Sequence, residues 1–153
     1  MKINIYIIDK KSKSDIYTPL IDHYKKSCRA FADVEIHEIF SKDISKAHDI
    51  GQAAAQKQYS LALEKHMAKG YSIVLDPSSK QLDSHQFANL FKDRGVVNLF
   101  IGGAYGFESG FISKSNSAVS FGKITLSHKL VKVVLMEQIF RALSIINNHP
   151  YHK

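Results

Sequence analysis

Hydrophobic and polar residues alternate along the chain in short blocks typical of strands and amphipathic helices. Residues 2–8 are β-branched and apolar, and they predict a first strand. Residues 33–40 alternate between apolar and polar and predict a second. Further strands are expected at 71–76, 96–101 and about 117–121. The segments 71–76 and 96–101 are almost continuously apolar, which fits central strands of a sheet that is covered on both faces.

Helical periodicity and helix-breaking residues fill the spaces between these strands. Four helices are predicted, at residues 19–31, about 46–69, 84–95 and 129–146. Thr18 is expected to cap the first, with Pro19 at its first helical position. Gly70 is expected to end the second, and Ser84 and Gly95 to bound the third. Strands that alternate with helices predict an α/β fold with a mostly parallel sheet flanked by helices, and 153 residues fit a single domain over 1–153.

The composition is that of a folded globular protein. Hydrophobic residues make up 44% and charged residues 23%, which argues against disorder. No apolar run approaches the roughly 18 residues of a membrane span, so no membrane partner is expected. The N-terminal segment indicates a strand rather than a signal peptide. The single cysteine, Cys28, excludes an internal disulfide framework and fits the reducing cytoplasm.

Positive charge is concentrated in the C-terminal part of the chain. The formal net charge is +7, and residues 111–153 hold six lysines and arginines against one acid, Glu137, a net of +5. A basic surface attracts a polyanion, and nucleic acid is the commonest one in a cytoplasm. The positive charge could equally well serve only to keep the protein soluble.

A glycine-rich loop follows the predicted strand at 96–101. Gly102, Gly103 and Gly106 let the backbone turn sharply and approach a ligand, and ligands of α/β sheets bind beyond the carboxyl ends of the strands. These glycines fit a loop that binds a nucleotide-like ligand, and they fit a simple tight turn equally well. A dinucleotide-binding fingerprint is excluded because position 101 is isoleucine and the loop lies late in the chain, and no phosphate-binding P-loop is present.

The chain ends in "HPYHK", directly after the predicted last helix. Arg141 on that helix fits a phosphate contact, Tyr151 fits stacking on a base, and a histidine can transfer a proton near neutral pH. Together with His128 at the start of the helix, these groups could bracket one patch, or the terminus could simply be ordered. A metal site is not expected, because His149 and His152 have no accompanying cysteine or carboxylate cluster.

Three segments together resemble the ribosomal RNA large subunit methyltransferase H family of the SPOUT class: "LFIGGAYGF", "ITLSHKLVKVVLMEQIFRA" and "HPYHK". The resemblance covers the whole chain. It implies a trefoil-knotted α/β fold, a homodimer, S-adenosylmethionine as methyl donor, and N3 of a pseudouridine in 23S rRNA of the ribosome as acceptor. A non-catalytic RNA- or ribosome-binding module with the same basic surface is the alternative.

The resemblance also implies which residues form the site. Those matched to the cofactor pocket are Leu75, Gly103, Gly122, Lys123, Ile124, Thr125, Leu126 and Ser127. Those matched to the catalytic side are His128, Arg141, Tyr151 and His152. The chain departs from the family pattern at Ala104 and Ser127, where the family has proline. Backbone contacts tolerate such changes, so we expect them to alter loop stiffness rather than activity.

Overall fold

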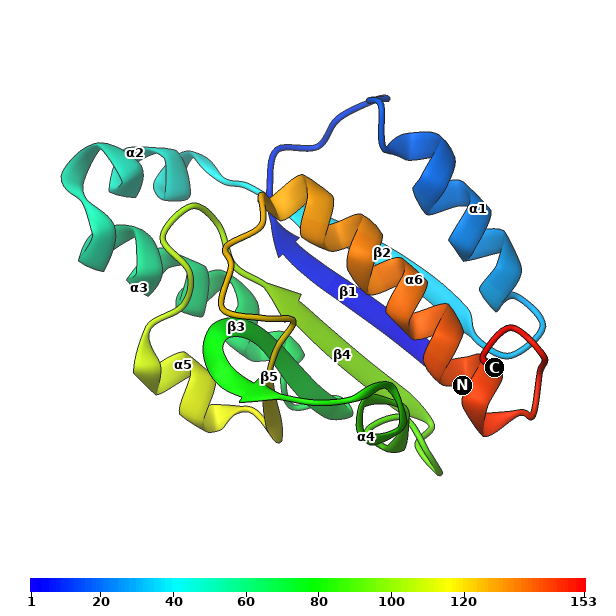
Figure 1. Cartoon of the computed structure of the whole chain (residues 1–153). Coiled ribbons are helices and arrows are strands. Elements are labelled where there is room, and N and C mark those ends of the chain that lie inside the picture. The colour runs from blue at the N-terminus through cyan, green and yellow to red at the C-terminus, as the bar shows by residue number, and fades with distance from the viewer.

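Five strands form one parallel sheet in the order β2-β1-β4-β3-β5 in the structure, a computed structural model that describes residues 1–153 (Figure 1). The strands are β1 (Lys2–Ile8), β2 (Asp33–Ile39), β3 (Tyr71–Gln81), β4 (Val96–Ile101) and β5 (Ser117–Ser120). In the middle of the sheet, Ile5 of β1 lies opposite Ile36 of β2 and Leu99 of β4. Every pairing is parallel, so the carboxyl ends of all the strands lie along one edge. The predicted α/β fold is confirmed.

Six α-helices cover the two faces of this sheet (Figure 1). They are α1 (Thr18–Cys28), α2 (Lys42–Ile50), α3 (Gln52–Leu63), α4 (Ser84–Asn89), α5 (Ser109–Lys114) and α6 (His128–Ile146). The period of two along a strand creates two cores. In β1, for example, Ile3, Ile5 and Ile7 pack with α1, α4 and α6. Tyr6 and Ile8 point the other way and pack with α2, α3 and α5.

The single long helix predicted at 46–69 is wrong. Helix α2 begins earlier, because the Ser41 side chain caps it by accepting a hydrogen bond from the Ile44 amide at 3.2 Å. Gly51 then breaks the helix with φ +143°, a conformation that suits glycine. Helix α3 packs back against α2, and a 3₁₀ turn (Glu64–His66) leads toward β3.

At two predicted helix starts, the expected residue does not act as the cap. Helix α1 begins at Thr18, but Asp15 rather than Thr18 accepts hydrogen bonds from the Tyr17 and Thr18 amides, at 2.9 and 3.1 Å. Helix α4 is capped by Asp83, one residue before the expected Ser84. Gln86 completes a capping box there, and α4 ends well before Gly95.

Strand β3 continues beyond residue 76, the predicted end of this strand, and includes Pro77. The pairing of β3 with β5 is interrupted between Leu75 and Lys80, so residues 76–79 leave the ladder. Proline has no amide hydrogen to donate, which fits such an irregularity. Helix α5 was not predicted; it is short, and Phe111 anchors it in the second core.

Candidate active site

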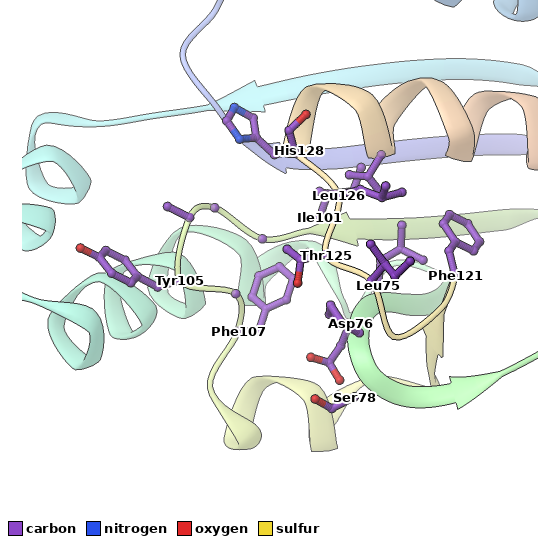
Figure 2. Close-up of a pocket in the computed structure, with 18 of the residues that line it drawn as sticks. Leu75, Asp76, Ser78, Ile101, Tyr105, Phe107, Phe121, Thr125, Leu126 and His128 are labelled. Carbon is purple, nitrogen blue, oxygen red and sulfur yellow. The ribbon is translucent and has the colours of Figure 1, made fainter.

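A cavity of about 600 Å³ lies at the carboxyl edge of the sheet (Figure 2). Three segments enclose it: residues 75–78 of β3, the loop 101–107 after β4, and residues 119–128, which lead from β5 into α6. These are separate in sequence and meet because the three strands are parallel. Half of the 20 lining residues are hydrophobic. The size and the mixed apolar and polar wall are typical of a pocket for a small organic molecule.

The glycine loop after β4 rests on α3. Gly103 packs against Tyr59, whose side chain is fully buried and whose hydroxyl lies 2.5 Å from Nε2 of His48. Burial raises the pKa of the Tyr59 hydroxyl. Gln56 of α3 donates a hydrogen bond to the Tyr105 carbonyl at 2.9 Å. The α2–α3 pair therefore fixes the position of the loop that forms one wall of the cavity.

We expect Gly103→Ala to lower the free energy of unfolding by about 1–3 kcal/mol, as overpacking of a filled site does. An added Cβ would lie 2.6 Å from the Tyr59 hydroxyl oxygen and 3.0 Å from Cγ2 of Ile8. Urea denaturation measures the effect. Gly110→Ala in α5 is the matched control, because a Cβ there meets nothing within 4 Å. Equal stability of the two variants would contradict this account of the loop.

The segment between β5 and α6 forms a second wall. Oγ of Ser120 lies 3.0 Å from the Pro77 carbonyl oxygen and 2.8 Å from that of Gly122, so its one hydroxyl hydrogen is within reach of both and ties this segment to the irregular part of β3. Gly122 has φ +136°, and Ser127 caps α6 by accepting from the Leu130 amide at 3.2 Å. This segment leaves large apolar side chains open to the cavity and the solvent, with Ile124 83% exposed.

Seven of the eight residues matched to a cofactor pocket line this cavity: Leu75, Gly103, Gly122, Ile124, Thr125, Leu126 and Ser127. The eighth, Lys123, is exposed and lies outside the lining. Five further residues that were not expected from the sequence also line it: Asp76, Ser78, Tyr105, Phe107 and Phe121. Asp76 could have been predicted as a site residue, because it is the polar residue that directly follows the apolar run of β3.

His128 lies at the rim of the cavity, at the first residue of α6 and beside the end of β1 (Figure 2). Its Nε2 is 3.1 Å from Oδ1 of Asp9, the residue that follows β1. The Asp9 side chain is only 11% exposed. A histidine in contact with a mostly buried carboxylate is a candidate proton acceptor.

The other three predicted catalytic residues gather around Glu137. Its Oε1 accepts hydrogen bonds from Nε and Nη2 of Arg141, at 3.1 and 2.5 Å, and from the Tyr151 hydroxyl at 2.9 Å. Nη1 of Arg141 lies 3.3 Å from Nδ1 of His152. Burial, together with the bond to Glu137, raises the pKa of the Tyr151 hydroxyl. The bond to Glu137 raises the pKa of Arg141.

Within one chain, the structure places His128 apart from Arg141, Tyr151 and His152, so these groups do not form one patch in a single copy. Arg141 lies 13 positions after His128 on α6, which is about 20 Å at 1.5 Å per residue. The chain end folds back at the far end of α6, away from the start of that helix (Figure 1). Glu137 orients Arg141 and Tyr151 through hydrogen bonds, and none of these three residues contributes to the wall of the cavity.

The structure has neither a cluster of metal-binding side chains nor a membrane-spanning helix. No three His, Cys, Asp or Glu side chains come close enough together to hold a metal ion. None of the helices has the length and apolar character of a membrane span.

The chain is similar to one group of proteins over its whole length. Residues 1–152 match the family model described as predicted SPOUT methyltransferase. Three curated relatives, each named ribosomal RNA large subunit methyltransferase H, come from Sulfurovum sp. (strain NBC37-1), Aliarcobacter butzleri and Helicobacter pylori. They are 65%, 46% and 41% identical to this chain, and each alignment covers 100% of both proteins.

Proposed function

Because this chain belongs to the SPOUT methyltransferase family, we propose that it methylates N3 of a pseudouridine in 23S rRNA, with S-adenosylmethionine as donor. The observation that carries the proposal is the cavity at the carboxyl edge of the sheet. Seven residues that the family resemblance assigns to the cofactor pocket line it, although they come from three distant segments. A non-catalytic RNA-binding module has no need of such a cavity.

The residues present fit this cofactor. When bound, the cofactor supplies an electrophilic methyl group on a positively charged sulfur. The apolar side chains of Leu75, Ile101 and Leu126 suit a purine ring, and the Asp76 carboxylate suits a cationic or hydroxyl group. The glycine loop offers backbone groups at close range. Binding through backbone and apolar groups also explains why Ala104 and Ser127 are acceptable in place of proline.

A homodimer would complete the site. In one chain, Arg141 lies about 20 Å along α6 from His128 at the rim of the cavity, and Tyr151 and His152 gather beside Arg141 and Glu137. We infer that the chain end of one copy reaches the cavity of the other and forms the acceptor side there. Ile16, Leu20 and Leu130 support an interface, since they are large apolar residues that α1, α6 and the loop before α1 leave exposed. The basic C-terminal part would bind rRNA phosphates.

The rest of the expected properties follow from this activity. We propose that residues 1–153 act as one methyltransferase domain with a trefoil knot formed by the segments around the cavity. The Ser120 bonds, which link residues near 77 and 122, support close passage of these segments. Because its proposed substrate is the ribosome, the enzyme would act in the cytoplasm.

Incubation with labelled S-adenosylmethionine tests the proposal. Ribosomes from a strain that lacks the corresponding enzyme should gain label in 23S rRNA, and calorimetry should detect cofactor binding to the protein alone. Salt-dependent binding to ribosomes without cofactor binding or label would instead establish the RNA-binding module. Label at a different base would keep the methyltransferase and overturn the assigned acceptor.

A further inference from the structure

The Asp9 carboxylate, which was not among the expected site residues, lies against His128 at the rim of the cavity. Its Oδ1 is 3.1 Å from Nε2 of His128. The two residues are far apart in sequence and meet because the carboxyl end of β1 lies beside the start of α6 (Figure 2).

The backbone fixes the orientation of the Asp9 carboxylate. The Asp9 amide donates to the Ile39 carbonyl at 3.2 Å, which ties the residue to the end of β2. The Lys10 amide donates to Oδ1 at 2.8 Å, the same oxygen that contacts His128. With its side chain 11% exposed, Asp9 is held rigidly rather than left to sample solvent. An acceptor-only group in this position selects a hydrogen on the nitrogen that faces it.

The other charged groups near the start of α6 have partners of their own. Lys132, one turn after His128, pairs with Glu38 of β2 at 2.8 Å. Lys129 lies 3.7 Å from the Asp15 carboxylate. Lys10 lies over the Phe40 ring, with Nζ 5.2 Å from the ring centroid. Asp9 is therefore the carboxylate that faces the His128 imidazole.

We propose that Asp9 is a positioning residue for methyl transfer, and that His128 accepts the N3 proton of the target base through Nδ1. A hydrogen bond from Nε2–H to Asp9 fixes the neutral tautomer that leaves the Nδ1 lone pair free. It also orients the ring and stabilises the imidazolium that forms, as a carboxylate does behind a histidine base.

The step balances without a further reactant. The N3–H proton passes to Nδ1 of His128, and N3 keeps the electron pair and forms the bond to the methyl carbon. The carbon–sulfur bond of the donor breaks, and its electron pair stays on sulfur, which becomes neutral. The imidazolium then releases its proton to water. The positive charge of the donor is thus carried away as this proton.

The inference rests on the proposed function, but one of its tests does not. Nitrogen NMR of the uniformly labelled protein without cofactor reports which imidazole nitrogen carries hydrogen. His128 is identified by the signal that His128→Gln removes. We expect the hydrogen on Nε2 in the wild type and a mixture of tautomers in Asp9→Ala. Asp15→Asn, which removes a carboxylate from the same loop, should leave the His128 signals unchanged.

Kinetics tests the consequence for the reaction. Asp9→Ala should lower kcat by about 10- to 100-fold, in the range of residues that orient a catalytic group. The KM for ribosomes should change little, because Asp9 is mostly buried. Asp9→Asn keeps the size and an acceptor oxygen and should fall between Ala and the wild type. In a His128→Ala background, Asp9→Ala should have no further effect.

The outcomes separate this inference from the proposed function. An active wild type with an unchanged kcat in Asp9→Ala would overturn the role of Asp9 alone. So would an unchanged tautomer in Asp9→Ala, or losses that multiply in the double variant. A wild type that transfers no methyl group to 23S rRNA would overturn the proposed function, whatever the tautomer of His128.

Discussion

Deletion of the last three residues, Tyr151–Lys153, is expected to abolish methyl transfer and to leave cofactor binding intact. None of these residues lines the cavity, so calorimetry with S-adenosylmethionine should give an unchanged affinity. Transfer should fail because the acceptor side loses Tyr151 and His152, which Arg141 and Glu137 orient. The deletion spares His149, whose amide bonds to the Ser144 carbonyl at 2.9 Å, so the end of α6 should stay folded.

A mixed dimer shows whose cavity the chain end serves. One copy carries His128→Ala with an intact end, and its partner carries the deletion with an intact His128. If each end acts in the other copy's cavity, the mixed dimer has one complete site and about half of the wild-type activity. If each end acts in its own cavity, both sites are defective and no activity returns. Purification with two different affinity tags isolates the mixed species.

The second large effect is expected from Lys132→Met, which should lower the free energy of unfolding by about 3–5 kcal/mol. Lys132 is only 4% exposed, and its Nζ lies 2.8 Å from Oε1 of Glu38, whose side chain is 18% exposed. The substitution leaves the Glu38 carboxylate mostly buried without a compensating charge. Urea denaturation, followed by far-UV circular dichroism, measures the loss.

Two controls identify the cause of that loss. Adding Glu38→Leu to Lys132→Met should recover most of the stability, because an apolar pair of similar size carries no buried charge. Lys2→Met breaks an exposed pair with Glu35, in which the side chains are 47% and 41% exposed, and should cost about 0–1 kcal/mol. A loss from Lys132→Met as small as that from Lys2→Met would show that burial of the pair contributes nothing.

Local signals in the sequence were sufficient for much of the fold. The strands near 2–8 and 96–101 and the helix near 129–146 were predicted within a residue, because each has a clear strand or helix pattern of apolar residues. Signals that depend on one residue were less reliable. Gly51 ends α2 inside a segment of good helix formers. This break was not predicted, because it depends on α3 packing back against α2. Thr18 was expected to cap α1, but the Asp15 carboxylate accepts the hydrogen bonds from the Tyr17 and Thr18 amides instead.

The sequence alone also indicated the wall of the cavity, since glycine after a buried strand and residues at carboxyl strand ends are local features. It predicted a parallel sheet with a ligand site at that edge, and the structure has a cavity there. Only the tertiary structure decided which charges meet. Asp9 contacts His128, Lys132 contacts Glu38, and Arg141 lies far from His128 in the same chain. These outcomes depend on the placement of α6, which begins beside the carboxyl ends of β1 and β2 and runs along one face of the sheet. Such long-range placement leaves no periodic trace in the sequence.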